Sequence, residues 1–496
     1  MTYRELDDCA DRIAGFLLSA GVQPGDRVGV IVPKGAAAIA AFFGIMKARA
    51  AYVPADHTAP AARNRTILTD CDVRVAFLTP SGATILDDWP ADRARPATVV
   101  FMGAQDPPAL AGIRTSNWQA ATRHDPVRVE GRRRDDLAYI LYTSGSTGVP
   151  KGVMLTHENA LSFVDWCSDV FAPSEEDRFS SHAPFHFDLS VLDIYVPLKH
   201  GATLHVISEE LGKSPKELAA FIADRKLTVW YSTPSILGLL GQFGDLDRSD
   251  CRALRLVLFA GEVFPVKHLR HISRLWPQAA FYNLYGPTET NVCTFARIPL
   301  PVPEDRTVPY PIGWPCAHCD PLVLGGELNP VEAGEEGLLY IAGPSVFQGY
   351  WNRPEQTASV FLERHGRRWY NTGDVVRLDS SDGFIYVGRR DRMVKRRGYR
   401  IELGEIERAL YQHPSVGEVA VVSVPDDDSG VRIIACLSGR DSARPSIIEM
   451  KTFCARNLPT YMSPDVFRFM DALPRTSTDK VDYQALTRLE QDKPRN

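Results

Sequence analysis

Residues 26–54 read DRVGVIVPKGAAAIAAFFGIMKARAAYVP. This pattern predicts a strand over 27–32, an apolar helix over 36–48 and a second strand over 51–53, which together form the β-α-β unit of a parallel sheet. Further short β-branched or apolar runs occur at 73–78, 98–102, 137–142, 203–207, 228–232 and 256–259, and turn-rich or helical segments separate them. We therefore predict an α/β fold that is not a repeat array.

The length and the composition narrow the class of protein. With 496 residues the chain exceeds one typical hydrophobic core, so we expect a large, subdivided domain and a smaller one. The net charge of -5 offers no basic excess for nucleic acid. The apolar run from Ala36 to Met46 is too short to cross a bilayer, and the acidic N-terminus does not resemble a signal peptide. We expect a cytoplasmic location, without a membrane or nucleic acid as partner.

The amino-acid composition of the sequence changes between residues 380 and 404. Turn residues at 380–383 precede a very basic stretch, Arg389 to Arg400, which could be only a solvated hinge surface. Beyond it the pattern predicts a helix over 402–412, strands over 418–424 and 431–437, and a helix over 447–457. We place the boundary here, with a large N-terminal domain at 1–390 and a small, mobile α+β domain at 391–496.

Cys316-Ala-His-Cys319 has a spacing that could serve zinc or a redox pair. Structural zinc needs four ligands, and the other cysteines do not cluster in sequence with this pair. Reduced thiols are the better interpretation.

The strongest chemical signal is the loop at 142–152, YTSGSTGVPKG, which directly follows an apolar strand. Its glycines allow backbone N–H groups to turn toward an anion, while its hydroxyls and one lysine add donors and charge. The spacing differs from that of a Walker A loop, and a lone loop of this kind could be a mobile turn. We predict that it binds phosphate.

At this loop the sequence resembles the adenylate-forming superfamily, which includes acyl-CoA synthetases, luciferases and the adenylation domains of nonribosomal peptide synthesis. The resemblance continues along nearly the whole chain, from Thr2-Tyr-Arg-Glu-Leu6 through Ala51-Tyr-Val-Pro54 to Lys480-Val-Asp482. It implies that the loop handles the β- and γ-phosphates of ATP.

Two further motifs extend the implied nucleotide site. In Asn283-Leu-Tyr-Gly-Pro-Thr-Glu289 the resemblance implies that Tyr285 stacks on adenine, Asn283 faces its edge and Glu289 binds Mg²⁺. In Tyr370-Asn-Thr-Gly-Asp374 it implies a carboxylate for the ribose hydroxyls, with Arg389 close by. The implied ATP-binding residues are Thr143, Ser144, Gly145, Ser146, Thr147, Gly148, Lys151, Gly261, Glu262, Asn283, Tyr285, Gly286, Thr288, Asp374 and Arg389.

Residues 388–407 resemble the superfamily's hinge and the segment after it, with Asp391 to Lys395 as the pivot. In that family the small domain rotates between two half-reactions, first presenting a lysine and then a loop, here around Gly398, that lines a thiol tunnel. Lys480 matches the lysine. An ammonium there would relieve the repulsion between a substrate carboxylate and the α-phosphate as they meet.

His186-Phe-Asp188 resembles the segment that carries an aspartate for the substrate α-ammonium in amino-acid-activating members. Such a carboxylate needs a cation to offset its desolvation. The other implied pocket residues form a small apolar set without a second charge: Leu189, Leu192, Tyr231, Leu258, Ala260, Leu284, Val292 and Cys293. With Asp188 and Lys480 the set resembles stand-alone prolyl-activating enzymes of pyrrole-forming pathways, which implies L-proline as substrate. Alanine-sized or valine-like amino acids remain open alternatives.

The chain ends 14 residues after Asp482 without a carrier segment, so we expect a separate phosphopantetheinylated carrier protein as partner. Two other classes of function are also compatible with the sequence. One is an acyl- or aryl-acid CoA ligase of the same superfamily. The other is an inactive binding or regulatory module, which the intact Asp188, Glu289, Asp374 and Lys480 disfavour.

Overall fold

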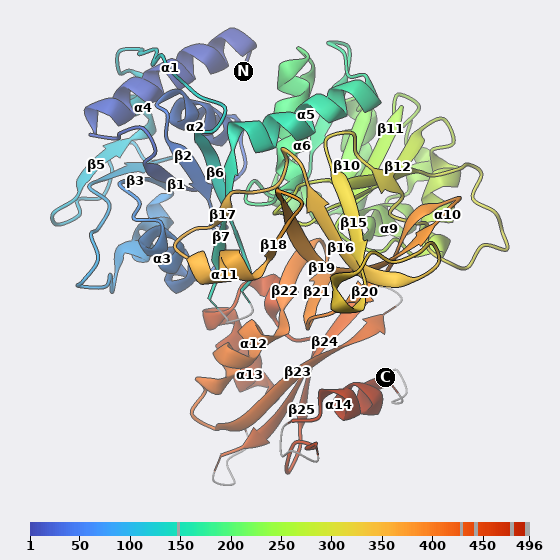
Figure 1. The fold of residues 1–496 in the computed structure, drawn as a ribbon. Coiled ribbons are helices and arrows are strands. Elements are labelled where there is room, and N and C mark those ends of the chain that lie inside the picture. The colour runs from blue at the N-terminus through green and yellow to red at the C-terminus, as the bar shows by residue number, and fades with distance from the viewer. Residues whose placement is uncertain (146–148, 427–429, 441–444, 477–480, 492–496) are drawn as a thin grey trace.

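The computed structural model of the chain describes residues 1–145, 149–426, 430–440, 445–476 and 481–491. The chain has a large N-terminal domain and a small C-terminal domain, which lies against one end of the large domain (Figure 1). The predicted mixed α/β fold is thereby confirmed. No helix among these residues is long and apolar enough to span a membrane.

The first sheet of the large domain contains the predicted β-α-β unit. Strands β1 and β2 pair in parallel, with Arg27 beside Ala51, and α2 (Ala36–Lys47) connects them. Only the last strands, β7 and β17, run antiparallel to their neighbours. The strand order is β17 (Gly349–Tyr350), β7 (Lys151–Thr156), β6 (Leu137–Thr143), β2 (Ala51–Pro54), β1 (Arg27–Ile31), β3 (Val75–Leu78), β4 (Thr98–Phe101) and β5 (Arg114–Asn117).

The second sheet has a parallel centre and two antiparallel strands at one side. Its order is β14 (Trp314–Pro315), β13 (Thr294–Arg297), β12 (Ala280–Tyr285), β11 (Leu256–Ala260), β10 (Val229–Ser232), β8 (Arg178–Ser181) and β9 (Thr203–Val206). In open α/β sheets, ligands bind beyond the carboxyl ends of the parallel strands. Here that edge is formed by the ends of β10, β11 and β12.

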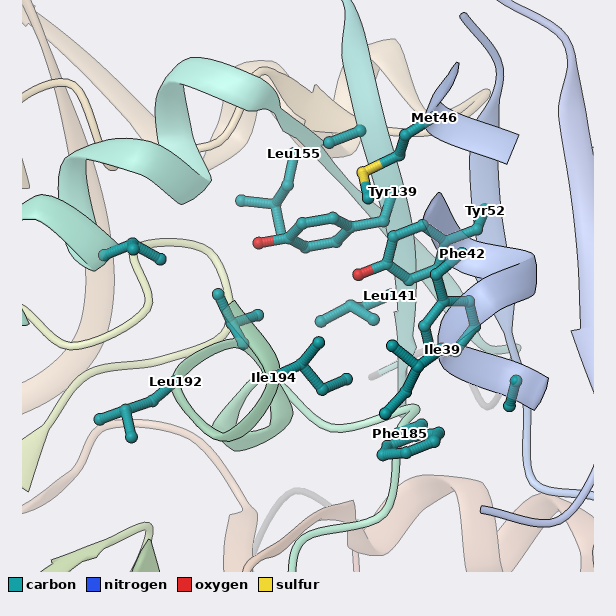
Figure 2. Close-up of a cluster of buried hydrophobic side chains, with 14 of the residues drawn as sticks. Ile39, Phe42, Met46, Tyr52, Tyr139, Leu141, Leu155, Phe185, Leu192 and Ile194 are labelled. Carbon is teal, nitrogen blue, oxygen red and sulfur yellow. The ribbon is translucent and has the colours of Figure 1, made fainter. Parts of the chain in front are cut away.

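One hydrophobic core joins these two sheets through α5 (His157–Phe171) and α6 (Leu189–Lys199). The rings of Phe42 and Tyr52 stack with centroids 4.3 Å apart, and the hydroxyl of Tyr195 on α6 donates to that of Tyr52 at 2.7 Å. On the same helix Ile194 faces this cluster, whereas Leu192 projects from another side (Figure 2). The core thus holds α6 in place and leaves its first turn beside the strand ends.

The third sheet of the large domain is antiparallel, with β15 (Asp320–Leu324), β16 (Glu336–Ala342), β19 (Arg367–Asp379) and β18 (Phe361–Arg364) in order, and β20 (Gly383–Arg389) on β19. The small domain contains a hairpin of β21 (Met393–Arg396) and β22 (Tyr399–Glu402), and a sheet of β23 (Val416–Asp426), β24 (Gly430–Gly439) and β25 (Val466–Phe469). Its helices are α12 (Leu403–Tyr411), α13 (Ile447–Asn457) and α14 (Tyr483–Gln491).

The remaining helices lie around the large domain. Among them α1 begins with a capping box between Thr2 and Glu5, which satisfies free N–H groups of its first turn. These helices are α1 (Tyr3–Ser19), α3 (Ala61–Asp70), α4 (Trp118–Thr122), α7 (Glu209–Gly212), α8 (Pro215–Asp224), α9 (Pro234–Phe243), α10 (Val266–Leu275) and α11 (Pro354–Ser359).

Element ends differ from the predictions by a few residues. The strand expected over 73–78 begins at Val75, because the N–H of Val73 bonds to the carbonyl of Leu68 and closes the end of α3 instead. Near the predicted domain boundary, β20 ends at Arg389 and β21 begins at Met393. Division of the chain at 390 and 391 remains our proposal.

Gly44 permits the close packing of α1 on α2. A Cβ at this position would lie 2.5 Å from Cγ2 of Ile13 and 3.1 Å from the carbonyl oxygen of Ala10. We predict that Gly44→Ala lowers the free energy of unfolding by about 1–3 kcal/mol through overpacking. Gly326→Ala, where a Cβ meets nothing within 4 Å, is the control and should stay within about 0.5 kcal/mol. Urea unfolding of both variants checks this, and equal stabilities would contradict the packing argument.

Candidate active site

A small cavity of about 50 Å³ lies beyond the ends of β10, β11 and β12. Both domains contribute to it. The large domain supplies the first turn of α6, the strand ends and the loop after β12, and the small domain supplies the β21–β22 hairpin. The lining residues are Asp188, Leu189, Tyr231, Ala260, Gly261, Gly286, Pro287, Thr288, Asn291, Val292, Met393, Lys395, Gly398 and Arg400.

Asp188 occupies the N-cap position of α6, but its side chain makes no capping hydrogen bond. The carboxylate faces the cavity instead. Burial raises its pKa, and a hydrogen bond from the Thr288 hydroxyl and the charge of Lys395 act in the opposite direction. The side chain of Asp188 therefore lines the cavity and does not cap the helix that begins after it.

The predicted apolar pocket residues fall into two groups. Leu189, Tyr231, Ala260 and Val292 line the cavity. Leu192, Leu258, Leu284 and Cys293 are buried, yet they do not line it. The first group forms the wall of the cavity, and the second group packs in the core.

Two cationic side chains line the cavity that were not among the pocket residues predicted from the sequence. Lys395 and Arg400, both from the β21–β22 hairpin, line it together with Asp188. Burial lowers the pKa of Lys395. A pocket without a second charge was expected, and this expectation fails because the large-domain motifs alone do not show which small-domain side chains reach the cavity.

A larger groove of about 1080 Å³ adjoins the cavity and is lined by many predicted nucleotide residues, among them Gly261, Glu262, Asn283, Tyr285 and Arg389. Asp374, fully buried, accepts a 2.8 Å bond from Nη1 of Arg389 and a bond from the Tyr285 hydroxyl. The amide of Asn283 donates to the carbonyl of Pro311 at 2.9 Å. Asn283, Tyr285 and Arg389 thus border one groove, and Asp374 lies buried behind it, bonded to Tyr285 and Arg389.

The phosphate loop is described only in part, because Ser146, Thr147 and Gly148 lie outside the described residues. Thr143 and Lys151 pair across β6 and β7, and the hydroxyl of Ser144 donates to the carbonyl of Arg400 at 2.7 Å. A Cβ on Gly145 would lie 2.0 Å from the carbonyl of Val149, so the loop needs glycine there. Burial, aided by the charge of Arg400, lowers the pKa of Lys151 to about 8.

Glu289, which the sequence assigned to Mg²⁺, is fully buried. Its two oxygens each lie 2.9 Å from Nη1 of Arg400, and Oε1 also accepts a 2.7 Å bond from the Tyr350 hydroxyl. Nζ of Lys151 lies 3.6 Å from the same oxygen. Burial alone would raise the pKa of Glu289, but the charges of Arg400 and Lys151 lower it to about 2. The carboxylate is therefore ionised.

The predicted hinge residues lie in different settings. Asp391 follows β20, and its carboxylate accepts two 2.6 Å bonds from Arg389. Lys395 lies within β21, with Nζ 5.2 Å from the centroid of the Tyr285 ring. The predicted catalytic residue Lys480 lies outside the described residues.

The loop between β21 and β22 inserts into the site. The N–H of Gly398 donates to Oε1 of Glu262 at 2.8 Å, and φ at Gly398 is +79°. A Cβ there would lie 2.4 Å from Cγ2 of Thr233. Only glycine permits both the conformation and the close approach. Gly398 also lines the small cavity, beside Asp188 and Arg400.

Sequence reasoning missed Arg400, Met393 and Tyr350 as site residues. Arg400 stood within the quoted hinge segment, two residues after Gly398, but a basic run does not show which cation turns inward. Tyr350 carries no motif and reaches the site because β17 pairs with β7, the strand of Lys151.

Cys316 and Cys319 are buried free thiols. Within the described parts of the chain no group of three or more His, Cys, Asp or Glu side chains could hold a metal ion.

Comparison with known proteins agrees with this geometry. The family described as AMP-binding enzyme matches residues 1–351, and the AMP-binding enzyme C-terminal domain matches residues 405–480. Two similar curated proteins are both named L-proline–L-prolyl-carrier protein ligase. The one from Streptomyces coelicolor is 40% identical over 98% of this chain and 91% of its own length. The one from Pseudomonas fluorescens is 38% identical over 98% and 94%.

Among solved structures, the amide bond synthetase McbA of Marinactinospora thermotolerans superposes with a TM-score of 0.85. The two sequences are 23% identical, and the match covers 98% of this chain and 94% of that one. At this identity the likeness shows a shared fold for both domains.

Tyr350 bridges two buried charges, since its hydroxyl accepts a 3.0 Å bond from Lys151 and donates to Glu289. We predict that Tyr350→Phe lowers the free energy of unfolding by about 1–3 kcal/mol, because both groups lose a buried partner. Tyr411→Phe, at a side chain that is 45% exposed, is the matched control and should change little. Urea unfolding measures both, and a Tyr350→Phe variant as stable as the control would refute the bridge.

Proposed function

The chain belongs to the family of AMP-binding enzymes, and from this we propose that it activates L-proline with ATP as prolyl-adenylate. In a second step the prolyl group passes to the phosphopantetheine thiol of a separate carrier protein. The similarity to the two proline ligases extends over 98% of the chain. This supports both the substrate and the partner.

The observation that carries the proposal is the charge pattern of the small cavity. Asp188 supplies one carboxylate, Lys395 and Arg400 supply two cations, and the wall between them is largely apolar. An amino acid has the complementary pattern, with an ammonium for Asp188 and a carboxylate or acyl phosphate for the cations. The apolar wall of Leu189, Tyr231, Ala260 and Val292 suits a compact aliphatic ring and offers no partner for a charged substrate side chain.

In the first half-reaction an oxygen of the proline carboxylate attacks the α-phosphorus of ATP. The bond from that phosphorus to the bridging oxygen of the β-phosphate breaks, and pyrophosphate leaves. Asp188 holds the proline amine so that the carboxylate points at the phosphate, and Tyr285, Asp374 and Arg389 hold the nucleoside. Positioning of this kind accounts for a large part of such rate enhancements. Lys480 would approach the two anions, and its role remains a proposal.

Glu289 is the residue that would hold Mg²⁺, in an arrangement in which Arg400 has left its two oxygens. The carboxylate is ionised and lies 3.6 Å from Nζ of Lys151, the last charged residue of the phosphate-loop motif. A hard cation that keeps its waters and shares its shell with phosphates needs only one or two carboxylates. Bound there, Mg²⁺ would supply positive charge that offsets the negative charge of the phosphates.

In the second half-reaction the thiolate sulfur attacks the prolyl carbonyl carbon, the acyl–phosphate bond breaks and AMP leaves. The present arrangement supports this step, because the Gly398 loop lies against Thr233 and Glu262 beside the cavity. Lys395 and Arg400 would then face the phosphate of the departing AMP.

An acyl- or aryl-acid ligase is the alternative in the same family. Its substrates have no amine and would leave Asp188 without a cation in the cavity. Pyrophosphate exchange with amino acids, fatty acids and aryl acids separates the two functions.

Asp188→Asn keeps the shape of the side chain and removes its charge. We predict that amino-acid activation weakens by about 3–5 kcal/mol, the cost of breaking an enclosed charge pair, while ATP affinity hardly changes. Asp165→Asn, at a half-exposed carboxylate on α5, is the control and should not affect either quantity. Pyrophosphate exchange and ATP binding report the two effects, and a parallel loss of ATP binding would show that Asp188 is structural.

The size of the cavity predicts the selectivity. One extra methylene in an apolar pocket costs about 1–3 kcal/mol, so L-proline should exceed pipecolate roughly 10- to 200-fold in kcat/KM. Amino acids with a cationic side chain should fail more completely, because the cavity already holds Lys395 and Arg400 and burying a further unpaired positive charge is costlier than a misfit methylene. Exchange assays decide this. If phenylalanine, a charged amino acid or an aryl acid outpaces proline, proline is not the substrate.

A further inference from the structure

The carboxylate of Glu289 has a complete set of partners in this arrangement. Nη1 of Arg400 lies 2.9 Å from both of its oxygens, the Tyr350 hydroxyl donates at 2.7 Å, and Nζ of Lys151 lies at 3.6 Å. Arg400 is the only one of these partners from the small domain, and the other two stand on strands of the first sheet. The guanidinium therefore occupies the cation position beside Glu289.

The position of Arg400 depends on how the small domain sits. Arg400 lies on β22, opposite Lys395, and its carbonyl accepts a 2.7 Å bond from Ser144 of the phosphate loop. The same hairpin is held by the bond from Gly398 to Glu262, and on α12 Glu405 pairs with Arg63 of the large domain. Any rotation of the small domain would withdraw the hairpin and Arg400 with it.

A divalent cation and Arg400 cannot share this carboxylate. Two cations at one buried carboxylate repel each other, and a divalent cation repels the guanidinium more strongly than a univalent one would. Mg²⁺ also needs room for ligand waters in an octahedral shell, whereas the guanidinium fills the space in front of both oxygens. One cation must leave Glu289 before the other can bind.

We propose that Arg400 and the divalent cation of the nucleotide bind Glu289 alternately, so that Arg400 senses whether the metal and its pyrophosphate have left. While the metal is bound, the small domain cannot adopt the arrangement described above. Once the metal and pyrophosphate leave, Arg400 takes over the carboxylate and stabilises the arrangement for thioester formation. This inference rests on the proposed function, because it requires a metal–nucleotide complex at Glu289. It makes Arg400 a positioning residue that orders the two half-reactions.

The test measures metal binding rather than turnover. Mn²⁺ binding by the full chain is followed by electron paramagnetic resonance in the presence of α,β-methylene-ATP, whose α–β linkage cannot be cleaved. Arg400→Gln removes the competing cation, so the complex should bind about tenfold more tightly than to wild type. Arg400→Lys retains a cation and should stay closer to wild type. Arg397→Gln removes one positive charge from an exposed position in the same loop and should have no effect.

A double-mutant comparison tests whether the effect passes through Glu289. In a Glu289→Gln background, Arg400→Gln should no longer tighten Mn²⁺ binding, because the shared carboxylate is gone. Unchanged or weaker Mn²⁺ binding by Arg400→Gln overturns the inference, as does a tightening that persists without Glu289. If wild type binds the analogue and activates proline while these outcomes occur, only the alternation fails. If wild type binds neither metal nor analogue, the proposed function fails as well.

Discussion

The structure of the site depends on the free-energy cost of removing carboxylate groups from water. Three carboxylates of the large domain, Asp188, Glu289 and Asp374, lie away from bulk water, and a carboxylate in such a place must be ionically paired or become neutral. Asp374 meets Arg389, Glu289 meets Arg400, and Asp188 lies near Lys395. All of these cations come from residues 389–400. Lys395 and Arg400 belong to the β21–β22 hairpin of the small domain, so their contacts with the site depend on where that domain lies, whereas Arg389 ends β20 of the large domain.

The first two sheets of the large domain make this charge pattern possible by fixing α6. The helix is anchored in the common core by contacts such as that of Tyr195 with Tyr52, so its first turn cannot drift from the ends of β10, β11 and β12. Leu192, Leu258 and Leu284 belong to the same core. The residues that the sequence analysis assigned to one pocket thus have two different roles. Some of them form the cavity wall, and the others pack in the core behind it.

The predicted nucleotide-binding residues are arranged differently from those of the small cavity. Its residues lie along an open groove rather than in a closed pocket, and Tyr285, Lys395 and Arg389 border it together. Lys395 and Gly261 also line the small cavity. The cavity and the groove are therefore continuous at the place where the acyl group and the phosphate would meet. A substrate bound at Asp188 and a nucleotide bound at Tyr285 would have their reactive ends at this junction.

The sequence alone predicted the class of fold, because apolar and β-branched runs in β-α-β order are local properties of the chain, and the resemblance of its motifs to the superfamily implied roles for the phosphate loop and Asp188. It could not determine which residues of the basic stretch turn inward. Arg397 is exposed while Arg400 pairs with Glu289, although they lie three residues apart. Nor could it find Tyr350, which reaches Lys151 and Glu289 only through the pairing of β17 with β7. Only the tertiary structure decides these contacts. A buried carboxylate pairs with whichever cation lies within hydrogen-bonding distance, and the packing of segments far apart in the sequence determines which cation that is.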